Sequence, residues 1–507
     1  MKKQKFTLII LMVALFTTSI KATDYFVKTD GLDTNDGLSW ATAKLTIASV
    51  GDMNSTVTIS GDNVYVAGGT YTIAAVMKPR SGVNVYGGYN ATTGVRDLVA
   101  NETVINGNAN RILQQSSSGP VLAASTTWDG FTITGGNKTS EGGGVSISHA
   151  TASFFTLSNC KITGNIGSKG GGINAAGCKI VNCIIENNTG TISAGGIYAY
   201  DGSGTIVENC IIRNNKVTAA GDANAGGGGV IVGGTTVMQN CLVYNNTSLT
   251  VAGGCDVQKQ GKVYNCTFVN NSSPNSGGVR VGYNASAGGT ISFQNNIVWN
   301  NSSASQVIAP TASIQNMVTN AFDAGGPSGQ LVLNASNTNI AGPNFVNPTS
   351  IIGNTAVVEE IATINATDLR MKASSPCVDA GTLADAPVTS YNGIARPKGF
   401  QIDMGAYENT SRYFVKTDGL DANDGLSWAT AKLTIASVGD MNSTVTISGD
   451  NVYVAGGTYT IAAVMKPRSG VNVYGGYNAT TGVRDLVANE TVINGNANRI
   501  LQQSSSG

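Results

Sequence analysis

Two pairs of oppositely charged side chains are the first candidates for chemistry in this sequence. Glu186 and Arg213 occupy the same place in neighbouring copies of an internal repeat, and so do Asp256 and Arg280. A carboxylate beside a guanidinium can move a proton or stabilise an anion. On a solvated sheet the same two groups are only a cross-strand ion pair. The residues alone favour the ion pair, and the four side chains remain the candidate catalytic residues.

Three aromatic side chains fall at outward positions of the same repeats. We expect Tyr198, Tyr244 and Trp299 to be the candidate ligand-binding residues, with rings on which a sugar could stack. The alternative is that they are ordinary aromatics on a solvated sheet.

An acidic turn near the N-terminus is the candidate metal site. Asp33, Asn35 and Asp36 stand before a glycine, as at the start of a calcium loop, but the distal Glu of an EF-hand is missing. The favoured interpretation is a polar turn that caps a helix expected at residues 41–50, with no cofactor. Calcium is the alternative.

Residues 141–301 position the charged and aromatic candidates through one repeated pattern. Each copy has two glycines and an apolar residue, then Asn-Cys, then Asn-Asn or a variant of it. A period of roughly 20–50 residues is typical of a solenoid. Apolar residues alternate at period two, which is strand spacing, and no repeat holds an amphipathic stretch long enough for a helix. The sequence therefore predicts an all-β parallel β-helix in which each repeat forms one coil.

The coil pattern also predicts which side chains stack inside. The five Asn-Cys cysteines should form an inward column, two apolar columns should run beside it, and the second Asn of each pair should adopt the left-handed corner conformation and bond to its copy one coil away. Coils stack about 4.8 Å apart, whereas a disulfide needs Cβ atoms about 3.8 Å apart. We expect free, buried thiols. The cysteine column is Cys160, Cys183, Cys210, Cys241 and Cys266.

Composition agrees with a solenoid and limits the partners. The chain has 507 residues, 65 of them glycine, and charged residues make up only 12%, about half the usual share. Thirty basic and thirty acidic residues cancel, and no basic patch stands out, so nucleic acid is not expected as a partner. Lysines precede an apolar run that ends near residue 20, which predicts a signal peptide at residues 1–22 and export. After its cleavage no transmembrane helix is expected.

The chain divides into five predicted segments. After the signal peptide come an N-terminal cap with the first coils at 23–120, the β-helix core at 121–350 and a C-terminal cap at 351–410. Residues 413–507 then repeat residues 25–119, with one difference, Thr34 against Ala422. This is a truncated second copy of the N-terminal segment.

Three stretches resemble known families. The Gly-Gly-Val/Ile and Asn-Cys-x-Ile/Phe-x-x-Asn repeats resemble those of polymorphic outer membrane proteins and other right-handed parallel β-helix proteins of the pectin-lyase-like superfamily. Residues 36–43 and 87–90 are similar to the start of many secreted bacterial β-helix proteins. Residues 375–381 and 403–408 resemble the choice-of-anchor Q segment of Gram-negative surface proteins.

These resemblances imply fold and location more than activity. They imply a right-handed β-helix on the cell surface of a Gram-negative bacterium, associated with the outer membrane, that acts as an adhesin or glycan-binding protein without catalysis. We expect a monomer whose partner is a polysaccharide or a cell-surface glycan. The alternative implied by the superfamily is a polysaccharide lyase acting on uronate-containing polysaccharide. A loop at residues 216–227 is a further candidate for contact with a partner.

Overall fold

The computed structural model describes residues 22–116, 122–148, 155–200, 204–219, 226–283, 290–302, 306–309, 315–323, 327–329, 336–372, 375–397, 401–409, 412–446 and 450–502. The signal peptide, except for its last residue, and the middle of the 216–227 loop lie outside these residues. None of the helices in the described ranges is long and apolar enough to cross a membrane.

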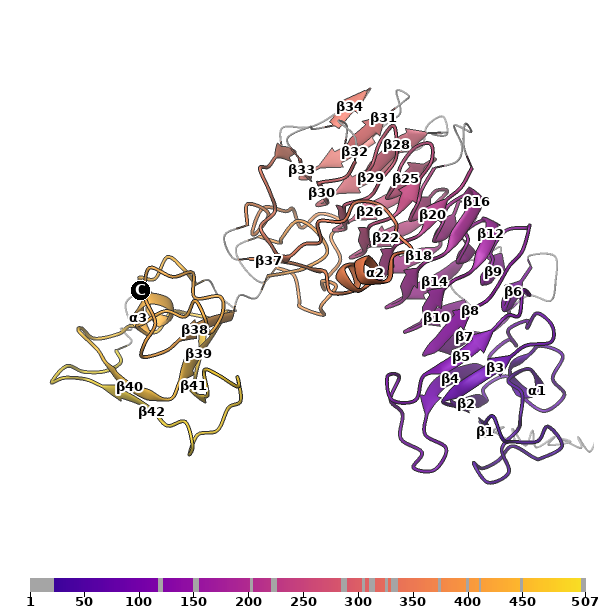
Figure 1. Ribbon diagram of the computed structural model, residues 1–507, viewed down its shortest axis with the longest axis horizontal. Coiled ribbons are helices and arrows are strands. Elements are labelled where there is room, and N and C mark those ends of the chain that lie inside the picture. The colour runs from indigo at the N-terminus through magenta and orange to yellow at the C-terminus, as the bar shows by residue number, and fades with distance from the viewer. Residues whose placement is uncertain are drawn as a thin grey trace, which may run out of the picture.

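Stacked coils form a right-handed parallel β-helix, as the repeat predicts (Figure 1). Strands of successive coils pair in parallel and build four sheets along the rod. Sheet 1 has eleven strands: β1 (Asp24–Val27), β2 (Asn63–Ala67), β4 (Asn84–Tyr89), β7 (Thr126–Asp129), β10 (Phe155–Ser158), β14 (Cys178–Val181), β18 (Ile206–Glu208), β22 (Val237–Gln239), β26 (Lys262–Tyr264), β29 (Ile291–Gln294) and β32 (Gln315–Val318).

Sheet 2 also has eleven strands and follows sheet 1 within each coil. They are β3 (Gly69–Thr72), β5 (Thr103–Asn106), β8 (Phe131–Thr134), β11 (Lys161–Thr163), β15 (Ile184–Glu186), β19 (Ile211–Arg213), β23 (Leu242–Tyr244), β27 (Thr267–Val269), β30 (Ile297–Trp299), β33 (Ala321–Phe322) and β35 (Thr338–Asn339).

Two smaller sheets complete the coil. Sheet 3 has four strands: β12 (Ile166–Lys169), β16 (Thr189–Ser193), β20 (Lys216–Val217) and β24 (Thr247–Ser248). Sheet 4 has nine: β6 (Leu113–Gln115), β9 (Val145–Ser148), β13 (Ile173–Ala176), β17 (Ile197–Ala199), β21 (Val230–Val232), β25 (Cys255–Gln258), β28 (Val279–Tyr283), β31 (Val307–Ala309) and β34 (Pro327–Gly329).

The predicted inward columns are confirmed. Ile162, Ile185 and Ile212 pair one above another in sheet 2 and are fully buried. Each such side chain contributes roughly 1.5–3 kcal/mol when it leaves water. All eight cysteines are buried and free, which agrees with the expectation for the five of the Asn-Cys column.

The second Asn of each pair bonds to its copy one coil away, as predicted, but the left-handed corner residue is the first Asn of the pair and not the second. The first Asn is the left-handed residue, as at Asn187 (φ 57°) and Asn214 (φ 53°). The second Asn turns inward, where Asn188 donates from Nδ2 to Oδ1 of Asn215 at 3.0 Å. The buried ladder runs through Asn165, Asn188, Asn215, Asn246, Asn271 and Asn301.

The glycine pairs allow the coils to approach closely between sheets 3 and 4. A Cβ on Gly195 would lie 2.5 Å from the carbonyl oxygen of Gly228 and 2.6 Å from the backbone nitrogen of Lys216. Only glycine fits at such a distance.

The N-terminal helix is shorter than expected. α1 (Ala48–Gly51) has four residues, and the rest of the predicted 41–50 helix forms turns that close the first coil. The Asp33 carboxylate accepts hydrogen bonds from the backbone amides of Leu45 and Thr46, and these bonds hold the turn region together.

We expected the C-terminal segment to cap the last coil. It lies instead along the outer face of sheet 2. It contains β36 (Phe345–Asn347), α2 (Val358–Asn365) and β37 (Asp368–Met371). The outward amides of Asn214, Asn245 and Asn270 donate to its backbone carbonyls. Its apolar residues join a core cluster with Leu242, Tyr244 and Val269 of sheet 2.

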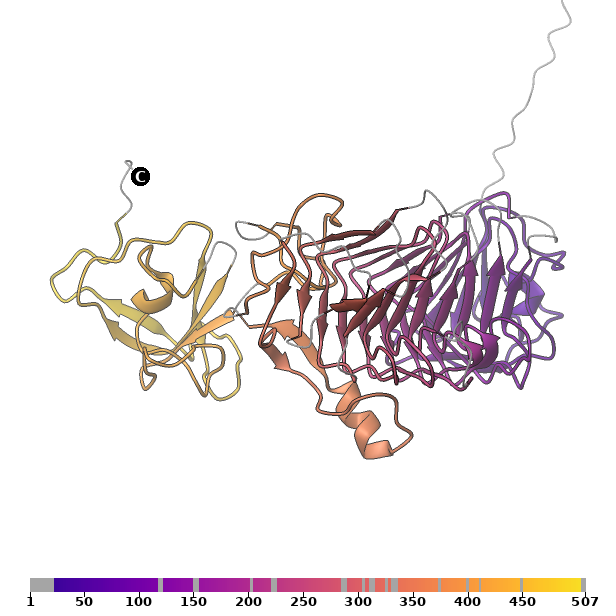
Figure 2. The ribbon, with the colours of Figure 1, turned by 90° about the horizontal axis from the view of Figure 1, so that it is seen from above.

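The second copy of the N-terminal segment folds as the first does and lies apart from the rod (Figures 1 and 2). Its elements are β38 (Arg412–Val415), α3 (Ala436–Gly439), β39 (Asn451–Ala455), β40 (Gly457–Thr460), β41 (Asn472–Tyr477) and β42 (Thr491–Asn494). They surround a core cluster of their own.

Candidate functional site

The structure brings Glu186 and Arg213 together on neighbouring strands of sheet 2, as predicted. Arg213 donates from Nε to Glu186 Oε2 at 2.8 Å and from Nη1 to the Tyr244 hydroxyl at 3.0 Å. Lys161 lies 3.0 Å from the other carboxylate oxygen. Burial raises the pKa of Glu186, but the nearby positive charges and their hydrogen bonds outweigh it, so the pKa is below its ordinary value. The pair is a buried ion network, and Arg213 is not free to act as a base.

Asp256 and Arg280 also pair on neighbouring strands, but in sheet 4. Arg280 donates from Nε to Asp256 Oδ1 at 2.9 Å and lies 4.1 Å from the ring centre of Tyr283. Both side chains are buried, and the backbone of Gly226 lies against them. The two predicted ion pairs therefore sit on different sheets and do not share one groove.

The three predicted sugar platforms do not form one surface either. Tyr244 and Trp299 lie on sheet 2 beneath the C-terminal segment, where Trp299 meets Phe345 edge to face at 6.1 Å. Tyr198 lies on sheet 4, nearly buried beside Tyr200. The expectation of solvated rings is wrong for Tyr244, which is only 2% exposed.

The acidic turn already holds a cation of its own. The Lys44 ammonium donates to the carbonyl oxygens of Asp33 (2.9 Å) and Asn35 (2.5 Å). The Asp33 carboxylate accepts from Leu45 and from Thr46, and Asp36 accepts from the Leu38 backbone. The turn is therefore held together by its own hydrogen bonds and by the Lys44 ammonium. Among the described residues, no three His, Cys, Asp or Glu side chains gather to hold a metal.

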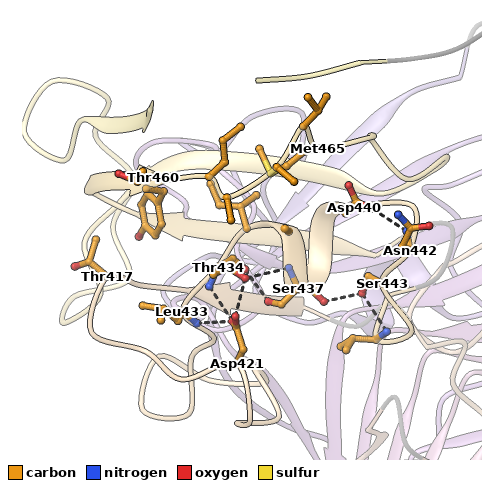
Figure 3. Close-up of a pocket in the computed structure, with 18 of the residues that line it drawn as sticks. Thr417, Asp421, Leu433, Thr434, Ser437, Asp440, Asn442, Ser443, Thr460 and Met465 are labelled. Atoms are coloured by element: carbon orange, nitrogen blue, oxygen red, sulfur yellow. Dashed lines mark hydrogen bonds between the residues drawn. The ribbon is translucent and has the colours of Figure 1, made fainter. Parts of the chain in front are cut away.

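A groove runs between this turn region and the first strand of sheet 2, and it occurs in both copies. Its volume is about 590 Å³ beside α1 and about 810 Å³ beside α3. Figure 3 shows that Asp421 in the second groove is engaged with Leu433 and Thr434. Asp440 is bound to the backbone of Asn442 and Lys466. Both acids that line the second groove therefore hold backbone turns together.

A different surface gathers half-buried aromatic rings at the N-terminal end of sheet 1. We call it the first aromatic face; it consists of Phe26, Trp40, Tyr65, Tyr86 and Tyr89. The parallel register places Phe26 opposite Tyr65 and Tyr65 opposite Tyr86. Tyr65 and Tyr86 stack with centroids 5.9 Å apart, and Trp40 meets Phe26 at 4.8 Å. The rings form one continuous apolar strip across three strands.

Polar side chains border the first aromatic face. Asn63 donates to Asp24 Oδ1 at 3.1 Å, in the column next to the rings. Arg96 lies 5.7 Å from the ring centre of Tyr86 and pairs with Asp129. Burial, the charge of Asp24 and a hydrogen bond to Asp24 raise the pKa of Tyr65 to about 12, so its hydroxyl stays protonated. A strip of rings edged by hydroxyl, amide and charged groups offers apolar contact and hydrogen bonds together.

The second copy repeats this surface. We call it the second aromatic face; it consists of Phe414, Trp428, Tyr453, Tyr474 and Tyr477. Tyr453 and Tyr474 stack at 5.9 Å, and Phe414 meets Trp428 at 4.8 Å.

Neither aromatic face was among the residues predicted from sequence. A signal was present, because Asn63-Val64-Tyr65 and Asn84-Val85-Tyr86 repeat with valine inward and the polar and aromatic residues outward. The Cys repeats of residues 141–301 are a more regular pattern than these two strands.

Comparison with known proteins places the fold in a family. The family model for a right handed beta helix region matches residues 53–257 and 143–345, together more than half of the chain. The chain therefore belongs to the right-handed β-helix family. No curated protein matches its sequence.

Some solved structures are similar to this chain at low identity. Pectate lyase Pel9A is 16% identical with a TM-score of 0.41, covering 77% of this chain and 97% of its own. XylC in complex with xylose is 11% identical with a TM-score of 0.32, covering 76% and 98%. The PL6 family alginate lyase AlyGC is 11% identical with a TM-score of 0.24, covering 89% and 67%. At these values the likeness concerns the fold alone.

Proposed function

We propose that the protein is an exported bacterial cell-surface protein that binds glycans through its two aromatic faces, without catalysis. The observation that carries the proposal is the strip of half-exposed rings on sheet 1, bordered by hydrogen-bonding groups and present twice. Rigid aromatic side chains supply contact area at a low cost in conformational entropy. Two such faces on one chain raise the effective affinity for a repeating polymer.

Location at the surface of a Gram-negative bacterium rests on the sequence. The predicted signal peptide supports export, and the resemblance of residues 375–408 to the choice-of-anchor Q segment supports outer-membrane association. The polymorphic-outer-membrane-protein-like repeats agree with an adhesive role for a monomeric rod. Protease treatment of intact cells tests this: a protein that is cut only after lysis is not surface-exposed.

Binding tests the proposed function directly. We expect purified protein to bind polysaccharide in titration calorimetry, and the variant Tyr65→Ala/Tyr453→Ala to bind at least about tenfold more weakly. Tyr200→Ala, which removes a half-buried tyrosine on the other side of the coil, is the matched control and should bind normally. Equal affinity of the first variant and the wild type would contradict the role of the faces.

The polysaccharide lyase alternative has its own assay. Cleavage of a uronate polymer by elimination produces unsaturated sugars that absorb ultraviolet light. We expect no new absorbance, because the candidate bases Arg213 and Arg280 are held in buried ion pairs. Absorbance that disappears in Arg213→Ala or Arg280→Ala would establish the enzyme instead.

A further inference from the structure

The two aromatic faces have the same ring geometry. Phe414, Tyr453 and Tyr474 repeat the positions of Phe26, Tyr65 and Tyr86. Three ring pairs, Phe–Trp, Trp–Tyr and Tyr–Tyr, have centroid distances that agree within 0.1 Å between the two faces. A sugar ring of the same size would meet the same apolar strip on either face. Any difference in the ligands of the two faces must therefore come from the polar and charged side chains that border the rings.

The border of the first strand differs in charge. The register places Asp24 opposite Asn63 in the first copy and Arg412 opposite Asn451 in the second. The first copy thus has the Asp24 carboxylate at the position where the second copy has the Arg412 guanidinium. Asn63 donates to Asp24 Oδ1 at 3.1 Å, which places this carboxylate at the edge of the first face, and the register places Arg412 at the matching edge of the second.

The arginine over the rings is present in both copies. Arg96 lies 5.7 Å from the ring centre of Tyr86 in the first face. Arg484 lies 5.6 Å from the ring centre of Tyr474 and donates from Nε to the Gly475 carbonyl at 2.9 Å. The border of the first face therefore holds Asp24 and Arg96, and the border of the second holds Arg412 and Arg484.

From these borders we infer that the second aromatic face selects anionic glycans, whereas the first takes neutral ones. The inference rests on the proposed glycan-binding function. A guanidinium matches the two oxygens of a carboxylate or a sulfate, and two guanidinium groups at one strip of rings favour a sugar that carries such a group. Asp24 repels the same groups from the first face. Uronate and sulfated sugars share this chemistry.

The experiment isolates each face in the full chain. Tyr65→Ala/Tyr86→Ala leaves the second face, and Tyr453→Ala/Tyr474→Ala leaves the first. Each variant is titrated with an oligogalacturonate, a sulfated oligosaccharide and a neutral xylo-oligosaccharide. We expect the second face to bind at least one acidic ligand about tenfold more tightly than the neutral one. That preference should shrink between about 0.02 M and about 0.3 M salt, because salt screens exposed charges.

The decisive change is Arg412→Asp in the variant that keeps only the second face. We expect it to weaken acidic binding about tenfold and to leave neutral binding within about twofold. In the variant that keeps only the first face, we expect Asp24→Arg to strengthen acidic binding and to leave neutral binding within about twofold. Circular dichroism checks that each variant is folded.

The outcomes separate this inference from the proposed function. If neither face binds any glycan, the proposed function fails. If both bind and Arg412→Asp changes nothing, only the charge selectivity fails. The uronate and sulfate titrations show which anion is preferred, and equal acidic affinity of the two faces would also overturn the inference.

Discussion

Arg213 shows how a side chain that resembles a catalytic group stabilises the fold. It neutralises Glu186 under the C-terminal segment, so its removal leaves the buried carboxylate with only the half-exposed Lys161. We expect Arg213→Met to lower the free energy of unfolding by about 3 kcal/mol, as when one member of a buried ion pair is deleted. Urea unfolding followed by tryptophan fluorescence measures this. Arg370→Met, which breaks the exposed pair with Asp368, is the control and should cost under about 1 kcal/mol; equal costs would contradict the argument.

Asp403 makes the C-terminal segment sensitive to pH. Burial and the neighbouring Glu408 raise its pKa from 3.8 to about 7, although Arg396 and backbone amides act in the opposite sense. The folded state therefore favours the protonated acid. Its contribution to stability is fully present below about pH 4 and is lost as pH rises through about 7.

We expect hydrogen exchange in residues 401–409 to become faster from about pH 5 to about pH 8 by more than the intrinsic pH effect, as the segment opens. Asp403→Asn should remove this excess. Asp368 has a lowered pKa, so Asp368→Asn should leave the excess unchanged over the same range. An excess that persists in Asp403→Asn would assign it to another group.

At the scale of elements, the asparagine ladder joins consecutive coils. Asn215 Oδ1 accepts from the backbone nitrogen and from Nδ2 of Asn188. We expect Asn215→Ala to destabilise the solenoid by about 3 kcal/mol, because two buried donors lose their acceptor. Asn187→Gly is the control: glycine adopts the left-handed corner freely, so the cost should stay below about 1 kcal/mol. Thermal unfolding by calorimetry compares them, and a control that costs as much as Asn215→Ala would contradict the ladder's role.

The coil could be predicted from sequence because its causes are local and repeated. Period-two alternation identifies strands, and the stacked Cys and Ile columns follow from a constant coil. The division of roles within each Asn-Asn pair could not be predicted, because both residues are the same type. Backbone dihedral angles decide that Asn187 forms the corner and Asn188 the ladder.

At the scale of the whole molecule, the position of the C-terminal segment also could not be predicted from the sequence. Its backbone carbonyls accept hydrogen bonds from the outward amides of Asn214, Asn245 and Asn270. Every residue has a carbonyl, so no sequence pattern marks these acceptors. The same segment covers Tyr244 and Trp299, and this is why two of the three predicted platforms are not open to a ligand. The first aromatic face lies on sheet 1, not on the sheet that this segment covers.

The repeated segment lets one substitution be tested in two environments with the same sequence. Val85 is fully buried in the first copy, where β4 has strands on both sides. The matching Val473 is 43% exposed, because β41 pairs on one side only among residues 412–502. We expect Val85→Ala to lower the stability of the solenoid by about 2 kcal/mol and Val473→Ala to change the second copy by less than about 0.5 kcal/mol.

Calorimetry of the full chain and of a chain ended after Asn409 assigns the transitions. The second copy has a core cluster of its own, so we expect two transitions in the full chain and only the solenoid transition in the shorter one. The second copy should unfold first, since it leaves Leu501 53% exposed where the matching Leu113 is buried. A single transition that shifts equally in both valine variants would mean that the two copies unfold as one cooperative unit. In that case, the second aromatic face would depend on the rod for its shape, and the two faces could not be treated as independent binding sites.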